Sequence, residues 1–286
     1  MATSVTRAGS LDEAVELLAR YGDDGAPLAG GTWIMRAWQR GERRKQHYVV
    51  LAGLHALCQI ETGVGVRIGA MVTHEELGRS RAVSVPAISA VAEAARTSAF
   101  PAIRSVATVA GNICAEPFPE ADLVPALLAC EAEVEIVTVS GRSQQPLETM
   151  LQRRPRLPPG AMIEHVLLPT QANRISAYQR LAVRGGGEYA VVSVAVSLDL
   201  DQSGRVEAAR VALGSVEERP RLSPGAAAAL IGAPLTGDRG LQAGEAAAAE
   251  CDARDGLDAP AWYRKAVLPA LIRDTVERLA AGEAAG

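Results

Sequence analysis

The sequence predicts a mixed α+β protein made of two consecutive domains, and three observations support this. The chain has 286 residues, whereas single domains usually contain about 100–200. Helical and strand patterns are interspersed through the first half. In the second half strand patterns come first and helical patterns follow, which is the order typical of an α+β domain.

Capping signals and alternation predict the elements of the first half. Ser10 with Glu13 and Thr73 with Glu76 form capping boxes that mark helix starts, and Gly22 suits a helix end. Apolar residues at helical spacing extend the helices, and β-branched or alternating runs indicate strands. The expected helices cover residues 10–21, 86–99 and 121–132, with a short one from 73 and a short helix or turn at 33–41. The expected strands cover residues 26–29, 47–54, 64–70, 133–139 and 161–169.

The second half begins near Ile175, after a Pro- and Arg-rich stretch at 153–160 that reads as a linker or rim loop. Strands at 188–200 and 205–214 flank DQSG, a hairpin signal. Three helical stretches follow, at 223–232, 239–252 and 260–281.

Composition argues against several classes of function. A net charge of −4 and 3% aromatic residues give no basis for binding nucleic acid. The longest apolar runs are far shorter than the roughly 20 residues of a membrane span, and the N-terminus lacks an apolar signal core, so a cytoplasmic location is expected. The histidines show no metal-ligand spacing, and no C-x-x-C pair holds a metal or iron–sulfur cluster. The dispersed cysteines are Cys58, Cys114, Cys130 and Cys251.

Two short stretches, AGGT at 29–32 and TVAGN at 108–112, combine small residues, glycine and a hydroxyl. Glycine lets a backbone approach a phosphate, successive N–H groups can bind it, and a hydroxyl adds a donor. Neither stretch has the spacing of a dinucleotide-binding G-x-G-x-x-G or of a P-loop. We interpret them as two loops that hold one diphosphate-containing cofactor, although a tight turn between packed elements would also explain each one alone.

Five motifs in order resemble the FAD-binding (medium) subunit of the molybdenum hydroxylases, the xanthine dehydrogenase and carbon monoxide dehydrogenase family. PLAGGTWIM is similar to the first flavin loop, and RIGAMVTHEEL to a strand and helix start. PAIRSVATVAGNICAEPFPEADLVPALLA resembles the most specific stretch of the family. ISAYQRLAVRGGGEYAVVSVAVSL and AWYRKAVLPALIRDTVERLA resemble the opening segment and closing helix of its C-terminal domain.

The resemblance implies an architecture and a role. The fold would be a two-lobed FAD-binding domain of the vanillyl-alcohol-oxidase (PCMH) type at 1–171, with lobes of about 1–55 and 56–171, followed by a smaller α+β domain at 172–286. The chain would bind FAD non-covalently. It would take electrons from a small subunit with two [2Fe–2S] clusters, beside a large molybdopterin subunit, in a dimer of heterotrimers. It would pass those electrons to an external acceptor, and it would contribute no catalytic acid or base and no metal site.

The resemblance also assigns site residues. The first loop, around the FAD diphosphate, comprises Ala29, Gly30, Gly31, Thr32 and Trp33. The second loop comprises Thr108, Val109, Ala110, Gly111 and Asn112. Asp122 would lie near the ribityl or ribose hydroxyls, and Ile163 and Tyr178 would surround the isoalloxazine ring. A loop at 185–188 would lie close to the flavin.

Three positions depart from the family pattern. Ala110 replaces a glycine, Trp33 a small polar residue, and Gln179 the lysine found in some relatives. Asp122 could instead cap a helix, and Tyr178 could be a core aromatic residue. Two other functions remain open, a self-contained FAD-dependent oxidase or reductase and a non-enzymatic scaffold that has lost flavin.

Overall fold

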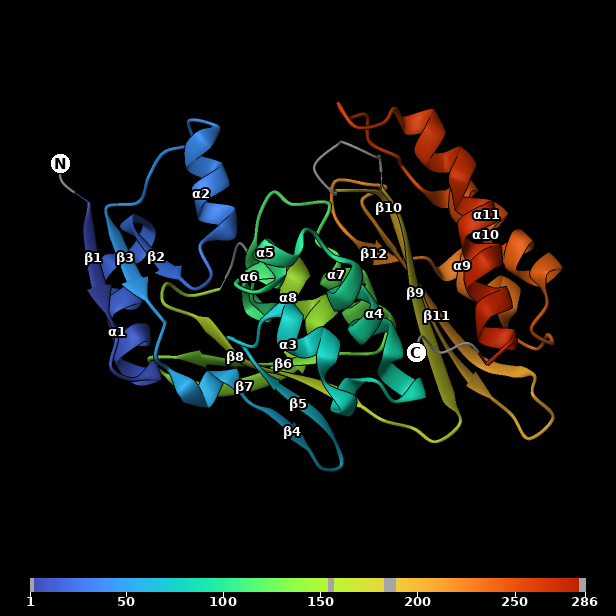
Figure 1. Cartoon of the computed structure of the whole chain (residues 1–286), viewed down its shortest axis with the longest axis horizontal. Helices are drawn as coiled ribbons and strands as arrows, with labels where there is room; N and C mark the ends of the chain where they lie inside the picture. Colours follow the sequence, from blue (N-terminus) through green and yellow to red (C-terminus); the bar gives the residue numbers. More distant parts are fainter. Residues whose placement is uncertain (1–2, 154–156, 183–188, 283–286) are drawn as a thin grey trace.

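A computed structural model describes residues 3–153, 157–182 and 189–282, and its strands form three sheets. The sheets and their helices follow one another as three blocks along the long axis of the molecule (Figure 1). We call them the N-terminal, central and C-terminal blocks. The fold is the mixed helix-and-strand architecture that the sequence predicted.

The N-terminal block holds a parallel three-stranded sheet in the order β1-β3-β2. A helix follows each of the first two strands, so both connections are crossovers. The elements are β1 (Ser4–Arg7), α1 (Leu11–Tyr21), β2 (Gly25–Leu28), α2 (Thr32–Gln39) and β3 (His47–Val50).

Helix α1 has the boundaries that its capping residues predict. The Ser10 side chain accepts a hydrogen bond from the Glu13 N–H at 3.1 Å. Gly22 ends the helix with a φ of +53°, and its N–H donates to the Leu18 carbonyl. The apolar face packs on the sheet through Ala14, Val15 and Leu18.

The central block holds an antiparallel five-stranded sheet in the order β4-β5-β8-β6-β7. Its strands are β4 (Ile60–Thr62), β5 (Gly65–Gly69), β6 (Glu133–Thr138), β7 (Gly141–Pro146) and β8 (Met162–Pro169). β8 lies between β5 and β6, so the two ends of the block meet in the middle of one sheet.

The central block has six α-helices, and all of them except α5 contribute side chains to the largest hydrophobic cluster. All seven residues of α7 are buried, and Pro125 lies in its first turn, where the missing N–H has no partner to lose. The helices are α3 (His74–Arg79), α4 (Ser89–Thr97), α5 (Pro101–Arg104), α6 (Val109–Cys114), α7 (Leu123–Ala129) and α8 (Leu147–Arg153). Short 3₁₀ turns occur at Gly22–Asp24, His55–Cys58, Arg81–Val83 and Pro86–Ile88.

The C-terminal block is an antiparallel sheet in the order β12-β11-β10-β9 whose three helices are grouped together beside it (Figure 1). Gly244 lets α10 approach α11 closely, because a Cβ there would overlap the backbone of Pro269. The elements are β9 (Arg174–Ala182), β10 (Ala190–Leu200), β11 (Val206–Gly214), β12 (Arg221–Leu222), α9 (Pro224–Leu230), α10 (Gly237–Glu250) and α11 (Ala261–Ala280).

Several elements differ from the sequence expectations. Pro86 starts a 3₁₀ turn rather than α4 itself, which begins at Ser89. Strand β7 was not predicted, because its sequence GRSQQP carries no apolar face and none of its residues is buried. Helix α8 extends to Arg153 and so shortens the expected linker, of which residues 154–156 lie outside the described part.

A buried charged pair joins the central and C-terminal blocks. Glu93 of α4 accepts a hydrogen bond from the Tyr178 N–H of β9 at 2.7 Å and pairs with Arg278 of α11 at 3.0 Å. Arg278 also donates to the Tyr178 carbonyl at 3.3 Å. Breaking one partner of such a pair leaves an uncompensated buried charge, so this contact holds the two blocks in one relative position.

Candidate functional site

The first loop leaves a run of backbone donors free. Gly31 has a φ of +71°, a left-handed conformation that turns the chain from β2 into α2. The Gly31 carbonyl accepts from the Met35 N–H at 2.9 Å and thereby closes the first turn of α2. The N–H groups of residues 29–34 and the Thr32 hydroxyl donate to no acceptor within the described residues. Successive free N–H groups at a helix start favour an anion.

The second loop uses its donors internally. Thr108 caps α6: its hydroxyl accepts from the Gly111 N–H at 3.1 Å, and its carbonyl accepts from the Asn112 N–H at 2.9 Å. A Cβ on Gly111 would lie 2.7 Å from the Thr108 hydroxyl oxygen. Glycine at 111 is therefore required by the cap itself.

The two remaining N–H groups of this loop bind the turn between β5 and α3. Val109 donates to the Val72 carbonyl at 2.9 Å and Ala110 to the Ala70 carbonyl at 3.1 Å. Asn112 contributes a side chain, whose Oδ1 accepts from the Leu123 N–H at 3.2 Å. This carbonyl oxygen fixes the orientation of the amide, and its NH₂ group is left as a donor.

The first loop contacts the backbone that leads into the second loop. A Cβ at Gly30 would overlap the carbonyl oxygen of Val106 and lie 2.6 Å from its carbon. Only glycine fits there, because the obstructing atoms belong to the backbone that leads into the second loop. The structure thus confirms that the two stretches converge, while a diphosphate bound between them stays a prediction.

An aromatic cluster connects the first loop to the C-terminal block. The Trp33 ring lies 4.7 Å from that of Phe118, which lies 6.0 Å from Tyr189. Arg40 lies over Trp33 at 4.5 Å and Arg36 over Tyr189 at 4.9 Å. Trp33 therefore contributes ring contacts at this position. The sequence analysis missed Tyr189 and Phe118, and only the position of Tyr189 beside the glycine-rich 185–187 segment was a signal.

Asp122 and Tyr178 lie together in the interior, between the central and C-terminal blocks. The Tyr178 hydroxyl donates to Asp122 at 2.6 Å, and Arg180 Nε lies 3.3 Å from the same oxygen. Burial raises the pKa of Asp122 to about 6, although Arg180 and the Tyr178 hydrogen bond act in the opposite direction. Asp122 makes no capping bond to α7, so the cap alternative is wrong. Burial also raises the pKa of Tyr178 well above its ordinary value.

Neighbouring residues of β9 face opposite sides of the sheet. Gln179 accepts a hydrogen bond from the Thr275 hydroxyl of α11 at 3.3 Å and so points toward the helices. Arg180 shares the face of Tyr178 and brings a positive charge to Asp122. Gln179 replaces the lysine found in some relatives, and Arg180 supplies a positive charge from the next position. The alternation of side chains along a strand could have predicted that residue 180 shares the face of Tyr178.

Ile163 is a core residue at the start of β8. It pairs with Ile136 in the sheet and belongs to the same hydrophobic cluster as Val109 and Tyr178. Its predicted position against the isoalloxazine ring stays a prediction. The 185–188 segment, also expected near the flavin, lies outside the described residues.

An exposed apolar surface lies next to the loop contact. This surface belongs to the 100–106 segment. Its Arg104 anchors the segment by donating to the carbonyls of Ser98 at 2.9 Å and Ala99 at 2.7 Å. The segment exposes three apolar side chains, which are Phe100, Ile103 and Val106.

The structure also bears on metal binding and on membranes. Within residues 3–153, 157–182 and 189–282, no cluster of three or more His, Cys, Asp or Glu side chains has the geometry of a metal site. None of the helices in those ranges is long and apolar enough to cross a bilayer.

Comparison with known proteins identifies two matching families. Residues 1–171 match the FAD-binding domain in molybdopterin dehydrogenase, and residues 176–279 match the CO dehydrogenase flavoprotein C-terminal domain. The two matches together cover most of the chain.

Individual relatives match over nearly their full length. The carbon monoxide dehydrogenase medium chain of Afipia carboxidovorans is 30% identical over 280 residues, covering 95% of this chain and 94% of the relative. The nicotine 6-hydroxylase medium subunit of Paenarthrobacter nicotinovorans is 29% identical, covering 93% of each. The reconstituted CO dehydrogenase from Oligotropha carboxidovorans superposes with a TM-score of 0.88 at 26% identity, covering 98% of each chain.

Proposed function

The chain belongs to the family of FAD-binding medium subunits of the molybdenum hydroxylases, and from this premise we propose how it carries FAD and what it does with the electrons. It takes electrons from the [2Fe–2S] clusters of a small partner subunit and passes them to an external acceptor. The observation that carries the proposal is the run of free backbone donors at 29–34, held against the second loop by the Gly30 contact.

The first loop binds the FAD diphosphate. Its free N–H groups and the Thr32 hydroxyl supply the donors, and the start of α2 supplies a favourable dipole. Hydrogen bonds to a charged group contribute about 1.5–3 kcal/mol each, so several together hold a dinucleotide without a basic side chain. Ala29 and Gly30 to Trp33 all lie in this loop.

The second loop positions the first. Thr108 and Gly111 maintain the cap, Val109 and Ala110 anchor the loop to the turn between β5 and α3, and the Asn112 amide adds a donor. Ala110 is tolerated because its N–H is already bonded and its methyl packs on the core. Asp122 with Arg180 and Tyr178 forms a polar group for the cofactor hydroxyls, and the apolar surface at 100–106 shields the ring from water.

FAD, when bound, supplies the redox chemistry of the subunit. The residues of this chain bind it, orient it and exclude water, and no acid or base of the chain is required for a step. Two partners complete the assembly, a small [2Fe–2S] subunit and a large molybdopterin subunit, as a dimer of heterotrimers. The relatives' designations as medium chain and medium subunit support this division of labour.

Co-expression with its partner subunits tests the proposal. We expect the chain to purify with two other polypeptides, with FAD equimolar to this chain and with iron–sulfur absorbance on the small partner. Substrate should reduce the flavin only when the small subunit is present. Reduction of the flavin in the isolated chain by substrate would contradict the electron-relay role and favour a self-contained oxidase. A folded chain that takes up no FAD would contradict the proposed FAD binding and favour a non-enzymatic scaffold.

A further inference from the structure

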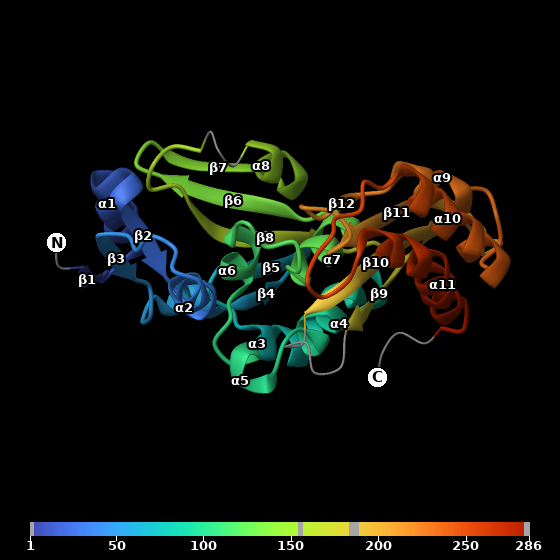
Figure 2. The same ribbon diagram turned by 90° about the horizontal axis from the view of Figure 1, so that it is seen from above.

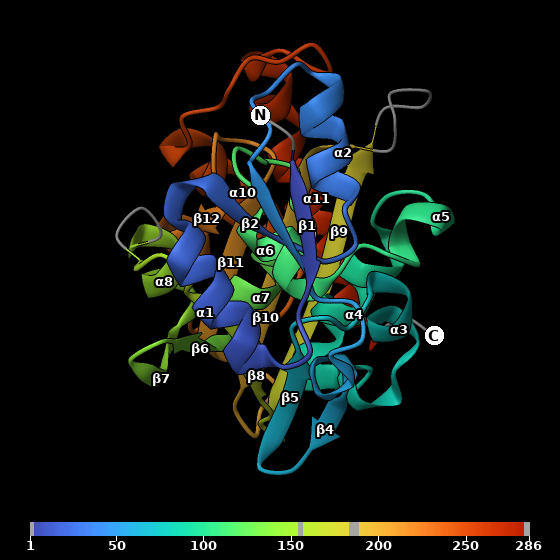
Figure 3. The ribbon, with the colours of Figure 1, turned by 90° about the vertical axis from the view of Figure 1, so that its left-hand side faces the viewer.

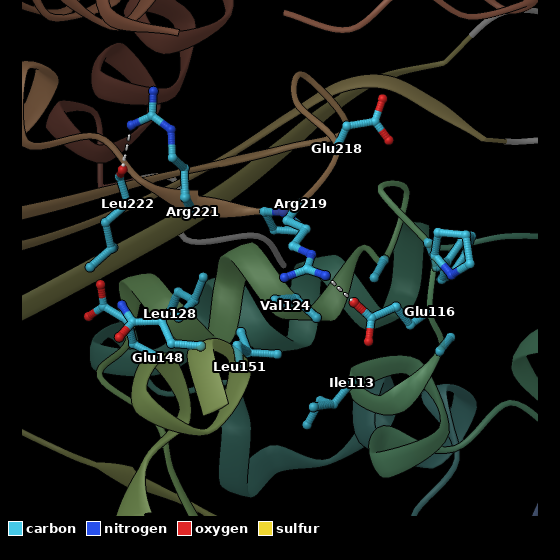
Figure 4. Close-up of a pocket in the computed structure, with 16 residues that line it drawn as sticks. Ile113, Glu116, Val124, Leu128, Glu148, Leu151, Glu218, Arg219, Arg221 and Leu222 are labelled. Carbon is cyan, nitrogen blue, oxygen red and sulfur yellow. Dashed lines mark hydrogen bonds and ion pairs between the residues drawn. The ribbon is translucent and has the colours of Figure 1, made fainter. Parts of the chain in front are cut away.

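A pocket of about 330 Å³ opens between the central and C-terminal blocks. It lies between α8, the 115–121 segment and the loop that enters β12 (Figure 4). Its lining is mainly apolar, and its size is at the lower end for small-molecule sites. The apolar residues that face it are Ile113, Phe118, Val124, Leu128, Leu151 and Leu222.

The rim carries charges of both signs, but the cations are already paired. Arg219 reaches across the opening to Glu116 at 2.6 Å (Figure 4). Arg221 pairs with Glu217 at 2.8 Å and donates to the Leu222 carbonyl. The carboxylates of two other rim residues pair with no cation of the described chain; they are Glu148 and Glu218.

The pocket is separate from the loop contact. Figures 2 and 3 both place α8 and β12 on one side of α6 and α7, and α2 and α5 on the other. Phe118 belongs to both sites, since it lines the pocket and contacts the rings of Trp33 and Tyr189. The 115–121 segment that forms one wall also connects the second loop to Asp122.

We propose that this pocket binds a small amphipathic cation, a single ring or short aliphatic body bearing a protonated amine, and that occupancy is coupled to FAD through Phe118. The apolar lining takes the body, and Glu148 and Glu218 favour the positive group. A ligand that shifts Phe118 changes its contacts with Trp33 and Tyr189, so binding at one site alters affinity at the other.

Calorimetric titration of the FAD-loaded full chain tests the site. The probe is 2-phenylethylammonium, compared with neutral 2-phenylethanol and anionic 3-phenylpropionate. We expect saturable binding of one cation per chain, about threefold or more tighter than the neutral probe, because each rim carboxylate contributes a modest attraction. No saturation at about 10 mM, an affinity weaker than −3 kcal/mol or so, or equal affinity for all three probes would overturn the proposal.

Matched variants locate the binding. Leu151→Trp fills the pocket and should weaken the cation at least about tenfold, whereas Val139→Trp on an exposed turn should not. The double variant Glu148→Gln with Glu218→Gln should remove the preference for the cation and retain the neutral probe. Glu207→Gln, an exposed control on β11, should leave the preference unchanged. Binding that persists in Leu151→Trp contradicts the location.

The coupling rests on the proposed FAD function, but the binding does not, so the titration is repeated on the FAD-free chain. Linkage requires the cation to change FAD affinity by the same factor by which FAD changes cation affinity. We expect a factor of about five or more, because coupling between sites is commonly about 5–150-fold. Equal cation affinity with and without FAD overturns the coupling. A chain that binds the cation but never FAD refutes the proposed function alone.

Discussion

The two glycine loops have almost the same composition but differ in what their backbones do. The N–H groups of the first, at 29–34, have no acceptor within the part of the chain that the structure describes. The second, at 109–112, gives every one of its N–H groups to an acceptor of the protein. Gly30 allows the loops to touch, and Gly111 allows a cap to form. A glycine beside a hydroxyl can therefore mark a binding loop or the support that holds it, and the hydrogen bonds distinguish the two.

The largest effect is expected from Gly30→Ala. The added methyl would overlap the Val106 carbonyl and force the loops apart, so we expect FAD content to fall about tenfold or more and stability to fall by about 4 kcal/mol or more. The measurements are the flavin-to-protein ratio and thermal unfolding. Gly63→Ala is the control, because no atom lies within 4 Å of a Cβ there. Full FAD content with unchanged stability in Gly30→Ala would contradict the claim that the Gly30 contact holds the first loop in its binding position.

Acid should weaken the anchoring of the second loop through His74. The backbone N–H of His74 donates to the Ala107 carbonyl at 2.9 Å. In its ring, Nδ1 lies 2.7 Å from the Ser98 hydroxyl, and the buried Nε2 has no hydrogen-bond partner in the described chain. Burial, with a smaller effect of Arg104, lowers the pKa of His74 to about 4. The stability it confers is complete above its ordinary pKa of 6.5 and is lost as pH falls toward 4.

A shift of this size corresponds to about 3 kcal/mol between those two pH values. Chemical denaturation across the range measures it, and His74→Asn should flatten the curve. Asp122 has the opposite sign: its raised pKa confers stability below 3.8 that disappears as pH rises through about 6. Asp122→Asn should therefore steepen the loss toward acid. A curve unchanged by His74→Asn would show that this histidine is not buried in neutral form.

The cap of the second loop gives an intermediate effect. Thr108→Ala and Gly111→Ala should each cost about 1 kcal/mol of stability, since each removes the same capping bond. The double variant should cost less than the sum, because the clash at Gly111 disappears with the hydroxyl. Denaturation of the FAD-free chain measures this cycle. Additive losses would indicate that the two residues act independently.

The smallest expected change in stability belongs to the binding loop. Thr32→Val should weaken FAD about tenfold by removing a donor to a charged group, yet leave the FAD-free chain within about 0.5 kcal/mol of its original stability. Fluorescence titration and denaturation measure the two quantities. Thr108→Val serves as the reciprocal control, with stability lost in the absence of FAD. If both variants changed FAD affinity and the stability of the FAD-free chain in the same way, the two loops would not differ in role.

Much of this architecture was accessible from sequence because it depends on local signals. Ser10 and Thr73 cap the helices they predicted, and the hairpin around DQSG joins β10 to β11. Strand β7 was missed because pairing, rather than side-chain character, makes it a strand. The sequence placed both stretches on one cofactor, but it did not predict the contact of Gly30 with Val106, since no local rule joins such distant positions.

The candidate site was only partly predictable for the same reason. The sequence located both loops, but whether a backbone N–H is free depends on distant acceptors such as the Val72 carbonyl. Arg180 was overlooked because its partner, Asp122, lies on another block. Asp122 and Tyr178 were both singled out, and the structure joins them by a hydrogen bond that neither motif implied.

Amide hydrogen exchange, measured by mass spectrometry with and without FAD, tests the central claim most directly. Free donors exchange rapidly and become protected when they bind a ligand, whereas bonded donors are protected already. We predict that FAD slows exchange at 29–34, while 109–112 exchanges slowly in both states. Unchanged exchange at 29–34 upon FAD binding, or rapid exchange at 109–112 in the FAD-free chain, would contradict the account.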